Sequence, residues 1–323
     1  MKVSIIVPLY NKSATIERAL ASIQAQTFRD FEVLVINDGS TDDGPSKVNG
    51  VGVRLICQAN AGPGAARNRG IREAQGELLA FLDADDEWLP QYLEESVRIL
   101  EAQPAEAACV TSGFYEWPAQ VSREQYCRHR GLKKGIHRLT AHTEPGLVIA
   151  MLAYMSPCST LARADVIRRH GGFFDRNHCL YGEDAFLWLK VLFNHPVAIQ
   201  MKPLVRFHLE ASELSKNLKG ARPVEPFLEF PEEIRSACPS GLRRLLSQVL
   251  AIRAQKTACV LGYWGKWLQA RALRRHFHVP GLWRLPYYFP ALVCSTPVGG
   301  WVSEAWRWLR SLRVSVMNPA ALD

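Results

Sequence analysis

The sequence predicts an α/β fold: a mostly parallel sheet flanked by helices, followed by a mainly helical C-terminal extension. Over residues 1–110, short apolar runs alternate with segments of helical spacing, which is typical of strand–helix–strand units. The runs are nearly continuous Val, Ile and Leu, the composition of strands that are covered on both faces. With 323 residues, the chain is long enough for one large domain and an appendage.

Each element follows from its local pattern. Residues 3–9 predict the first strand, and residues 13–26 a helix with Ser13 as its cap and Ile16, Leu20 and Ile23 on one face. Further strands are predicted at 32–37, 54–57, 78–82 and 107–111, and further helices at 64–75, 90–102, 163–169 and 184–193. A loop-rich basic stretch covers 123–138. We expect a first domain over 1–215, a Pro-rich linker over 216–240, and a helical region over 241–323.

Charge is distributed unevenly along the chain. Residues 1–240 hold 27 Lys and Arg against 29 Asp and Glu, whereas residues 241–323 hold 12 against two, so the excess of +8 is C-terminal. The same C-terminal region holds six of the nine tryptophans, a combination that suits an anionic membrane surface. A helical cap whose tryptophans pack on the first domain explains the same residues equally well.

Several classes of protein do not fit the composition. No apolar run reaches the roughly 20 residues that span a bilayer, and the first residues lack the pattern of a signal peptide. The eight cysteines form no Cys-x-x-Cys pair, so neither a zinc knuckle nor a disulfide framework is indicated. No nucleic-acid motif accompanies the basic tail, and nucleic acid is not an expected partner. These features favour a cytoplasmic protein, with peripheral attachment to the inner face of the cell membrane as the further expectation.

Two predicted strands end in aspartates. Asp38 follows the strand at 32–37, and Asp83-Ala-Asp85-Asp86 follows the strand at 78–82. Ligands of open parallel sheets bind beyond the carboxyl ends of the strands, so both groups face one crevice. Asp38 can accept hydrogen bonds from a base or ribose, or begin an ordinary Asp-Gly turn with Gly39. The Asp-x-Asp oxygens suit Mg²⁺ or Mn²⁺, although solvated acids before a helix are the simpler alternative.

Other polar side chains are predicted near the same crevice. Tyr10 ends the first strand and can stack on a base or pack on the sheet, and Arg67 follows a Gly-rich loop and can face a nucleotide or solvent. Glu183 and Asp184 begin a helix, where acids serve as general bases or only complement the helix dipole. His208 can be a metal or phosphate ligand or a structural histidine.

Five segments, taken in order, carry a resemblance to a known family. They are Val3-Ser-Ile-Ile-Val-Pro-Leu-Tyr-Asn11, the stretch from Gln26 to Asp42, Gly64-Ala-Ala-Arg-Asn-Arg-Gly70, Gly76 to Asp86, and Gly182-Glu-Asp184. In these motifs the chain resembles family 2 of the inverting glycosyltransferases, whose GT-A fold has a Rossmann-like, mixed, mostly parallel sheet. The resemblance covers residues 2–215. One departure is the spacing from His208 to Ser212, which is wider than the His-x-x-Ser of many family members.

The resemblance implies a role for each of these residues. Tyr10 and Asp38 would contact the nucleotide base, assisted by Arg67, and Asp83 would bind ribose or metal-bound water. Asp85, with Asp83 and His208, would hold a divalent Mg²⁺ or Mn²⁺ ion. The remaining residues expected at the nucleotide sugar are Pro8, Asn11, Gly39 and Ser40.

The resemblance also implies an activity. Asp184, with Glu183 beside it, would be the base of a single inverting displacement that moves a hexosyl or N-acetylhexosaminyl group from a nucleotide-diphosphate sugar, UDP-sugar by analogy, to an acceptor hydroxyl. The acceptor would be a cell-surface polysaccharide or a lipid-linked glycan. We expect the helix N-terminus to lower the pKa of Asp184.

Two alternatives belong to other classes of protein. One is a non-catalytic module that binds a sugar nucleotide or glycan on the same fold, since a fold alone does not fix activity. The other is a nucleotidyltransferase, but the Gly-rich phosphate loop that such chemistry needs after the first strand is absent.

Overall fold

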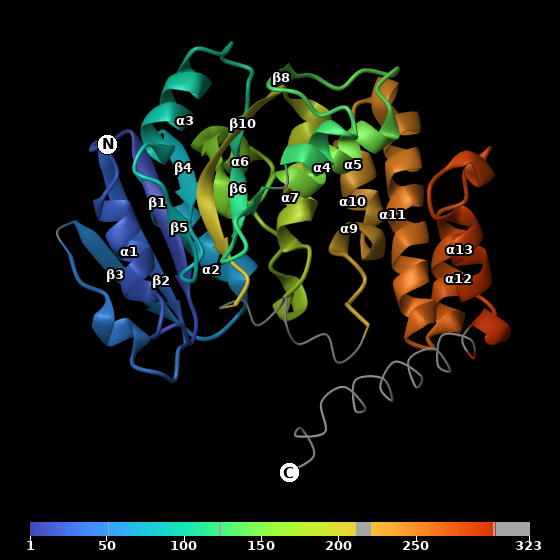
Figure 1. Cartoon of the computed structure of the whole chain (residues 1–323), viewed down its shortest axis with the longest axis horizontal. Coiled ribbons are helices and arrows are strands. Elements are labelled where there is room, and N and C mark those ends of the chain that lie inside the picture. Colours follow the sequence, from blue (N-terminus) through green and yellow to red (C-terminus); the bar gives the residue numbers. More distant parts are fainter. Residues whose placement is uncertain (51, 123, 211–220, 300, 302–323) are drawn as a thin grey trace. The chain divides into compact units, whose positions relative to one another are not determined.

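The structure is a computed structural model that describes residues 1–50, 52–122, 124–210, 221–299 and 301. The described residues of Met1–Asn217 and Glu225–Arg243 form one compact unit. Those of Leu218–Val224 and Arg244–Asp323 form a second unit. Figure 1 shows the elements of both.

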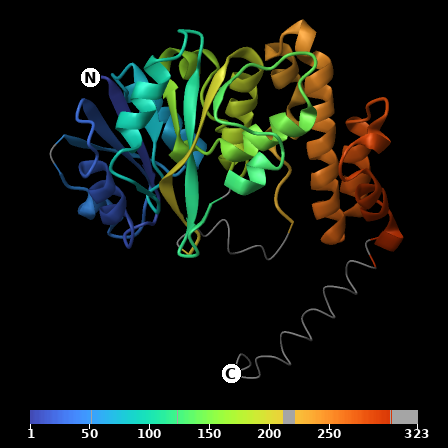
Figure 2. The same ribbon diagram turned by 45° about the horizontal axis from the view of Figure 1, so that its top comes forward.

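A ten-stranded sheet forms the centre of the first unit, with strand order β3-β2-β1-β4-β9-β6-β10-β5 and with β7 on β6 and β8 on β10. Strands β3, β2, β1 and β4 are mutually parallel, and β9 runs antiparallel between β4 and β6. The long strands β6 and β10 are parallel and lie side by side (Figure 2). The strands are β1 Val3–Leu9, β2 Phe31–Asp38, β3 Val53–Gln58, β4 Leu78–Phe81, β5 Glu87–Trp88, β6 Cys109–Trp117, β7 Val121–Ser122, β8 Gly135–His137, β9 Thr160–Arg163 and β10 Val197–His208.

Helices cover both faces of this sheet. The odd-numbered side chains of β1 join one buried cluster with α1 (Ile16–Gln24) and α3 (Tyr92–Glu101). On the opposite face, α2 (Pro63–Glu73) crosses β1 so closely that a Cβ on Gly70 would lie 2.4 Å from a methyl carbon of Ile6. The other helices among the described residues of this unit are α4 Glu124–Arg128, α5 Pro145–Tyr154, α6 Ala164–Arg169, α7 Glu183–Asn194, α9 Pro226–Glu229 and α10 Pro231–Ala237.

The predicted fold class is confirmed, and the element boundaries differ in places. Helix α1 begins at Ile16 with Thr15 as its cap, so Ser13 is not the cap that the sequence predicts. The backbone N–H of Ser13 instead donates to Asp42 Oδ2 at 2.8 Å. The sequence did not predict β9, β10 or α5. Strand β10 contains Pro203, where its register against β6 shifts, and a proline within an apolar run argues against a strand.

Part of the predicted Pro-rich linker is helical. Helices α9 and α10 lie within it, and each begins with a proline at its first turn, where a missing N–H costs no hydrogen bond. Phe227 of α9 is fully buried, and Asn194 Nδ2 donates to the Ala237 carbonyl at 2.9 Å. These contacts join residues 225–243 to the first unit. Pro226 and Pro231 therefore begin helices.

The described part of the second unit contains helices α11 (Arg243–Tyr263), α12 (Trp267–His276) and α13 (Tyr288–Cys294), with a one-turn helix at Leu282–Arg284. Its small core contains Ala258, Leu261, Ala270 and Ala291. Among the described residues, no helix is both long enough and apolar enough to cross a bilayer. The tryptophans at 306 and 308 lie outside the described residues.

Candidate active site

The turns that follow β1 and β2 are joined to each other at the carboxyl edge of the sheet. Leu9 pairs with Asn37 in the parallel register, which brings the two strand ends together. Asn11, at a φ of 51°, accepts the Thr41 N–H on its Oδ1 at 2.8 Å, and its own N–H donates to Ser40 Oγ at 3.2 Å. Tyr10 remains 46% exposed at this edge. The predicted residues Asn11 and Ser40 are therefore joined directly at this edge, next to Tyr10 in the chain.

Asp38 fixes the loop that leads into α2. Its Oδ1 accepts hydrogen bonds from Gln58 Nε2 at 2.8 Å and from the Ala61 N–H at 2.9 Å, and its Oδ2 accepts the Gly62 N–H at 2.9 Å. The adjacent Gly39 has a φ of 73°, and a Cβ there would lie 2.8 Å from the Asn60 nitrogen. The buried Asp38 carboxylate thus has a clear structural role, and its contact with a base stays a prediction.

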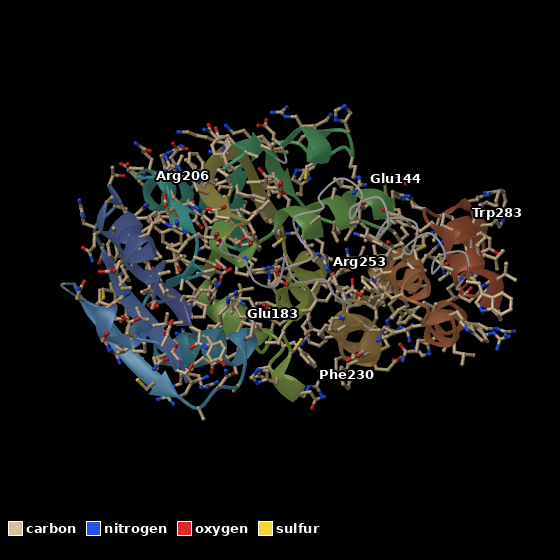
Figure 3. All side chains as sticks on the ribbon, turned by 60° about the horizontal axis from the view of Figure 1, so that its bottom comes forward. Glu144, Glu183, Arg206, Phe230, Arg253 and Trp283 are labelled. Atoms are coloured by element: carbon tan, nitrogen blue, oxygen red, sulfur yellow. The ribbon has the colours of Figure 1, made fainter. Side chains whose placement is uncertain are left out.

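Arg67 on α2 is a buried cation between two acids. Its Nη2 lies 2.6 Å from Asp83 Oδ1, beyond the end of β4, and its Nη1 lies 2.8 Å from Glu183 Oε1 at the start of α7. The guanidinium carbon lies 5.2 Å from the centre of the Phe173 ring. Burial opposes its charge, but Asp83 and Glu183 outweigh burial and raise the Arg67 pKa. Arg67 therefore connects the strand-end acids to the helix-start acids, and Figure 3 labels Glu183 within the first unit.

Asn68 positions the loop before α7, a role that the sequence did not predict. Its Oδ1 accepts the Phe173 N–H at 2.8 Å, and its Nδ2 donates to the Phe173 carbonyl at 2.8 Å and to Asp175 Oδ2 at 2.9 Å. Gly172, with a φ of 74°, makes room for it, because a Cβ there would lie 2.3 Å from Asn68 Oδ1. The only sequence signal was its place beside Arg67 in the Gly64–Gly70 motif.

Asp184 is partly buried in the first turn of α7, where its Oδ1 accepts the Ala185 N–H at 2.8 Å. Burial and the neighbouring Glu183 raise the pKa of Asp184 to about 7, while Arg67 and the Ala185 N–H act in the opposite direction. The expectation of a lowered pKa is therefore wrong, because loss of solvent outweighs the helix terminus. A carboxyl group with a pKa near neutrality is suited to general base catalysis.

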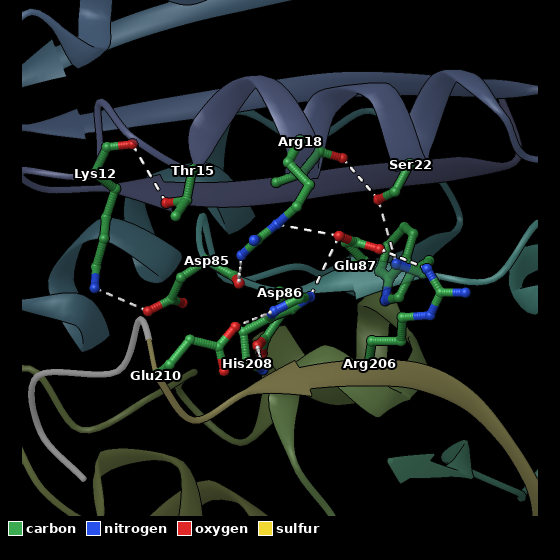
Figure 4. A network of polar contacts seen from close by, with 12 residues as sticks. Lys12, Thr15, Arg18, Ser22, Asp85, Asp86, Glu87, Arg206, His208 and Glu210 are labelled. Carbon is green, nitrogen blue, oxygen red and sulfur yellow. Dashed lines mark hydrogen bonds and ion pairs between the residues drawn. The ribbon is translucent and has the colours of Figure 1, made fainter. Parts of the chain in front are cut away.

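The Asp83–Asp86 turn concentrates negative charge beside a lysine from the first strand's turn. Lys12 Nζ lies 2.8 Å from Asp85 Oδ2 (Figure 4). Burial, with the Asp83 charge next, raises the pKa of Asp85. Burial and the charges of Asp83 and Asp85 raise the pKa of Asp86 well above its usual value, and the buried Asp86 Oδ2 has no hydrogen-bond partner among the residues that the structure describes. A cation at this turn would lower the cost of holding these acids ionised.

His208 closes the opposite side of this turn. Its backbone N–H donates to Asp86 Oδ1 at 3.0 Å. Its ring atoms Nδ1 and Nε2 lie 2.8 Å from Glu210 Oε1 and 3.3 Å from Glu87 Oε1 (Figure 4). Glu87 also pairs with Arg206 at 3.0 Å. The imidazole thus faces Glu87 and Glu210, and its metal role stays a prediction. Ser212 lies outside the described residues.

The acids fit a divalent cation in donor type. Among the described residues, however, no three Asp, Glu, His or Cys side chains are arranged to hold a metal ion. Asp83 and Asp85 already pair with Arg67 and Lys12, so each offers its remaining oxygen lone pairs. Mg²⁺ commonly takes only one or two carboxylates and completes its shell with water and substrate phosphates. The residues present therefore fit a metal that binds together with a diphosphate.

Comparison with known proteins identifies relatives of the first unit. The family model described as Glycosyl transferase family 2 matches residues 4–157. The uncharacterized glycosyltransferase alr2836 of Nostoc sp. is 39% identical over 107 residues, which is 31% of this chain and 33% of the relative. YibD of Escherichia coli is 45% identical over 98 residues, which is 29% of this chain and 28% of the relative. RP339 of Rickettsia prowazekii is 29% identical over 208 residues, which is 62% of this chain and 63% of the relative. The matches thus span less than two thirds of the length of each relative.

Solved structures share the fold over nearly the whole chain. S. aureus TarS residues 1–349 align with a TM-score of 0.69 at 19% identity, covering 95% of this chain and 92% of TarS. The mannosyltransferase PcManGT of Pyrobaculum calidifontis, solved with GDP-Man and Mn²⁺, aligns with a TM-score of 0.54 at 18% identity, covering 95% and 87%. The family match, the sheet order and these structures lead to one conclusion. Residues 4–157 match the model of glycosyl transferase family 2, and the fold of the chain is of the GT-A type.

Proposed function

We propose that the protein is an inverting glycosyltransferase that moves a sugar from a nucleotide-diphosphate donor, a UDP-sugar, to an acceptor hydroxyl. The observation that carries this proposal is the position of Asp184. Its pKa is raised to about 7, and it stands beside Glu183, which shares Arg67 with Asp83. A proton acceptor therefore lies next to the acids that the family uses for the donor.

The donor would lie across the carboxyl ends of β1, β2 and β4. Exposed Tyr10 offers a ring for stacking on the base, and the joined turns at Asn11 and Ser40 support its position. Asp38 would reach the base through its remaining lone pairs, with Gly39 allowing close approach, and Asp83 would contact the ribose. UDP is favoured because TarS structures contain UDP and UDP-GlcNAc, although PcManGT contains GDP-Man.

The transfer would proceed in one displacement. The ionised Asp184 accepts the proton of the acceptor hydroxyl, and the oxygen forms a bond to the anomeric carbon on the face opposite the diphosphate. The bond from the anomeric carbon to the diphosphate oxygen breaks, and the nucleoside diphosphate leaves with its electron pair. Arg67 holds Glu183 beside Asp184 and opposes the rise in the pKa of Asp184. The protein would thus contribute to catalysis in two ways, by positioning the acceptor hydroxyl against the anomeric carbon and by accepting its proton.

A divalent Mg²⁺ or Mn²⁺ ion would stabilise the negative charge that grows on the leaving diphosphate. Asp85 and Asp83 are the residues that would hold it, and His208 is a further candidate across the turn. Lys12 would then exchange its contact with Asp85 for a phosphate oxygen, because a lysine ammonium is a suitable phosphate partner.

The acceptor class proposed is a growing cell-surface polysaccharide or a lipid-linked glycan, and the sugar class is hexosyl or N-acetylhexosaminyl. A second candidate function is a non-catalytic module that binds a sugar nucleotide or glycan. The complete set of acids, Asp83, Asp85 and Asp184, favours the enzyme over this module.

The proposal is tested with a panel of sugar nucleotides and the full chain. Metal-dependent thermal stabilisation identifies the donor, because a ligand that binds the native state raises the unfolding temperature. Transfer is then measured as nucleotide release in the presence of acceptor glycans. We expect Asp184→Asn to keep donor stabilisation and to lose transfer by about 10²–10⁴-fold.

A matched control is available on another helix. Asp165 lies in the first turn of α6, is exposed and pairs with Arg169, so Asp165→Asn should leave transfer unchanged. Transfer by Asp184→Asn at the level of this control would refute the proposed base. Donor binding by the wild type without transfer to any acceptor would favour the non-catalytic module.

A further inference from the structure

Apolar side chains are exposed mainly on the second unit. Of the fourteen large hydrophobic side chains that are exposed among the described residues, eight fall between residues 268 and 301. Exposed apolar side chains that are concentrated in one region mark an interaction site more often than ones scattered singly over a surface. The eight are Leu268, Trp283, Tyr287, Phe289, Leu292, Val293, Val298 and Trp301.

Three of these residues share one face of α13. Phe289, Leu292 and Val293 are spaced i, i+3 and i+4, so they project from the same side of the helix. The opposite side is fixed inward: Ala291 is fully buried, and Gly262 of α11 approaches so closely that a Cβ there would lie 2.1 Å from the Cys294 carbonyl oxygen. The exposed face of α13 therefore cannot turn inward without losing this packing.

The second unit that carries these side chains is also rich in positive charge. Residues 244–301 contain eight Lys and Arg and no Asp or Glu. On α12, exposed Arg271 and Arg275 lie one turn apart on the side that also carries Leu268. Exposed Arg284 has its guanidinium carbon 4.8 Å from the centre of the Trp283 ring, a side chain labelled in Figure 3. The unit thus presents arginines and aromatic rings together.

We propose that this surface docks on an anionic lipid bilayer. Phe289, Val293 and Trp283 would enter the boundary between headgroups and acyl chains, and Arg271 and Arg275 would contact lipid phosphates. An anionic bilayer satisfies both halves of the surface, since it offers an apolar layer beneath a negative one. Nucleic acid would neutralise the arginines but leave the aliphatic side chains in water, and a second copy of this unit would oppose like charges.

The docking does not depend on sugar transfer, and its test measures vesicle binding alone. The full chain is sedimented with vesicles of phosphatidylcholine, and with vesicles of phosphatidylcholine and phosphatidylglycerol. We expect strong preference for the anionic vesicles and weaker binding at high salt. The triple variant Arg271→Gln, Arg275→Gln, Arg284→Gln should bind about 100-fold more weakly, since each basic residue near such a surface contributes about 1 kcal/mol.

A second variant tests the apolar half. Phe289→Ser with Val293→Ser should weaken binding by about 10-fold or more, because both side chains lose their transfer out of water. The control, Leu55→Ser with Val121→Ser, changes exposed apolar side chains of the first unit and should bind as the wild type. Every side chain changed in these variants is exposed, so all variants should keep the wild-type circular dichroism and unfolding temperature.

Four results would overturn the inference. The wild type could remain in the supernatant with both kinds of vesicle, or bind neutral and anionic vesicles equally. The two surface variants could bind as tightly as the wild type. Finally, analytical ultracentrifugation could reveal a dimer that Phe289→Ser with Val293→Ser abolishes, without vesicle binding, which would make the surface a contact between copies.

Discussion

The raised pKa of Asp184 predicts how the transfer rate depends on pH. The group must be ionised to accept a proton, so the rate should rise with pH and level off above an apparent pKa of about 7. Two neighbours of opposite charge act on it. We therefore expect Arg67→Gln to move the acid limb of the profile to higher pH and Glu183→Gln to move it to lower pH.

The size of both shifts follows from the effect that a neighbouring charge has on a carboxyl pKa. A pKa of about 7 against the ordinary 3.8 means that the folded protein favours protonated Asp184. The difference is worth roughly 4 kcal/mol at about 1.4 kcal/mol per unit. A charge within about 4–6 Å commonly moves a carboxyl pKa by about 1–3 units. Each substitution should therefore move the limb by at least about one unit, a change of about tenfold in rate at a fixed pH below the limb.

The assay is kcat against pH at saturating donor. Saturation matters because Arg67 also pairs with Asp83, and its loss should weaken donor binding separately from the pKa effect. Arg69→Gln is the matched control, since Arg69 lies on the same helix and pairs with Glu73 at the surface. This control should reproduce the wild-type profile.

The opposite signs make the reasoning refutable. Damage to the site in general would lower kcat in both variants and leave the limb in place. An unmoved limb in both variants, or movement in the same direction, would show that Asp184 does not set the profile. The double variant should return the limb toward its wild-type position, because the two neighbouring charges cancel.

Two further predictions concern stability. Asn68→Ala should lower the free energy of unfolding by about 2–4 kcal/mol in urea, because it removes hydrogen bonds to both backbone groups of Phe173 and to Asp175; a loss below about 0.5 kcal/mol would contradict its proposed role in holding the loop. His170 Nε2 lies 3.0 Å from His195 Nε2, and burial, with the His195 charge next, lowers the His170 pKa to about 4. The unfolded chain then binds more protons than the folded one between about pH 4 and 6.5, so stability falls as the pH drops through this window. The loss is about 1–2 kcal/mol after allowing for partial exposure, and His170→Asn should flatten the dependence in urea unfolding at pH 7 and pH 5; an unchanged slope would refute it.

Local patterns predicted the part of the fold built from adjacent segments. Strands β1, β2, β3 and β4 and helices α2, α3, α6 and α7 lie within a few residues of their predicted bounds. Strand β10 was missed because its partner, β6, is distant in sequence, and because Lys202 and Pro203 interrupt its apolar pattern. Such pairing depends on tertiary contacts, which residue spacing does not reveal.

The sequence predicted where the candidate site lies on the sheet, but it did not predict which side chains interact there. Parallel strand order alone places Asp38 and Asp83 at one edge of the sheet. The pairing of Arg67 with Glu183 joins residues 116 positions apart, and no local pattern contains it. Likewise, the raised pKa of Asp184 depends on burial that only the folded chain creates.

The two ion pairs of Arg67 also decide where this chain can be divided. The family match ends at residue 157, whereas Glu183 lies beyond it. A fragment that stops at residue 157 would keep the arginine and Asp83 but lose the second acid, and a buried charge with an incomplete set of partners is costly. The shortest fragment worth expressing for activity must therefore include α7, even though the family model alone marks an earlier boundary.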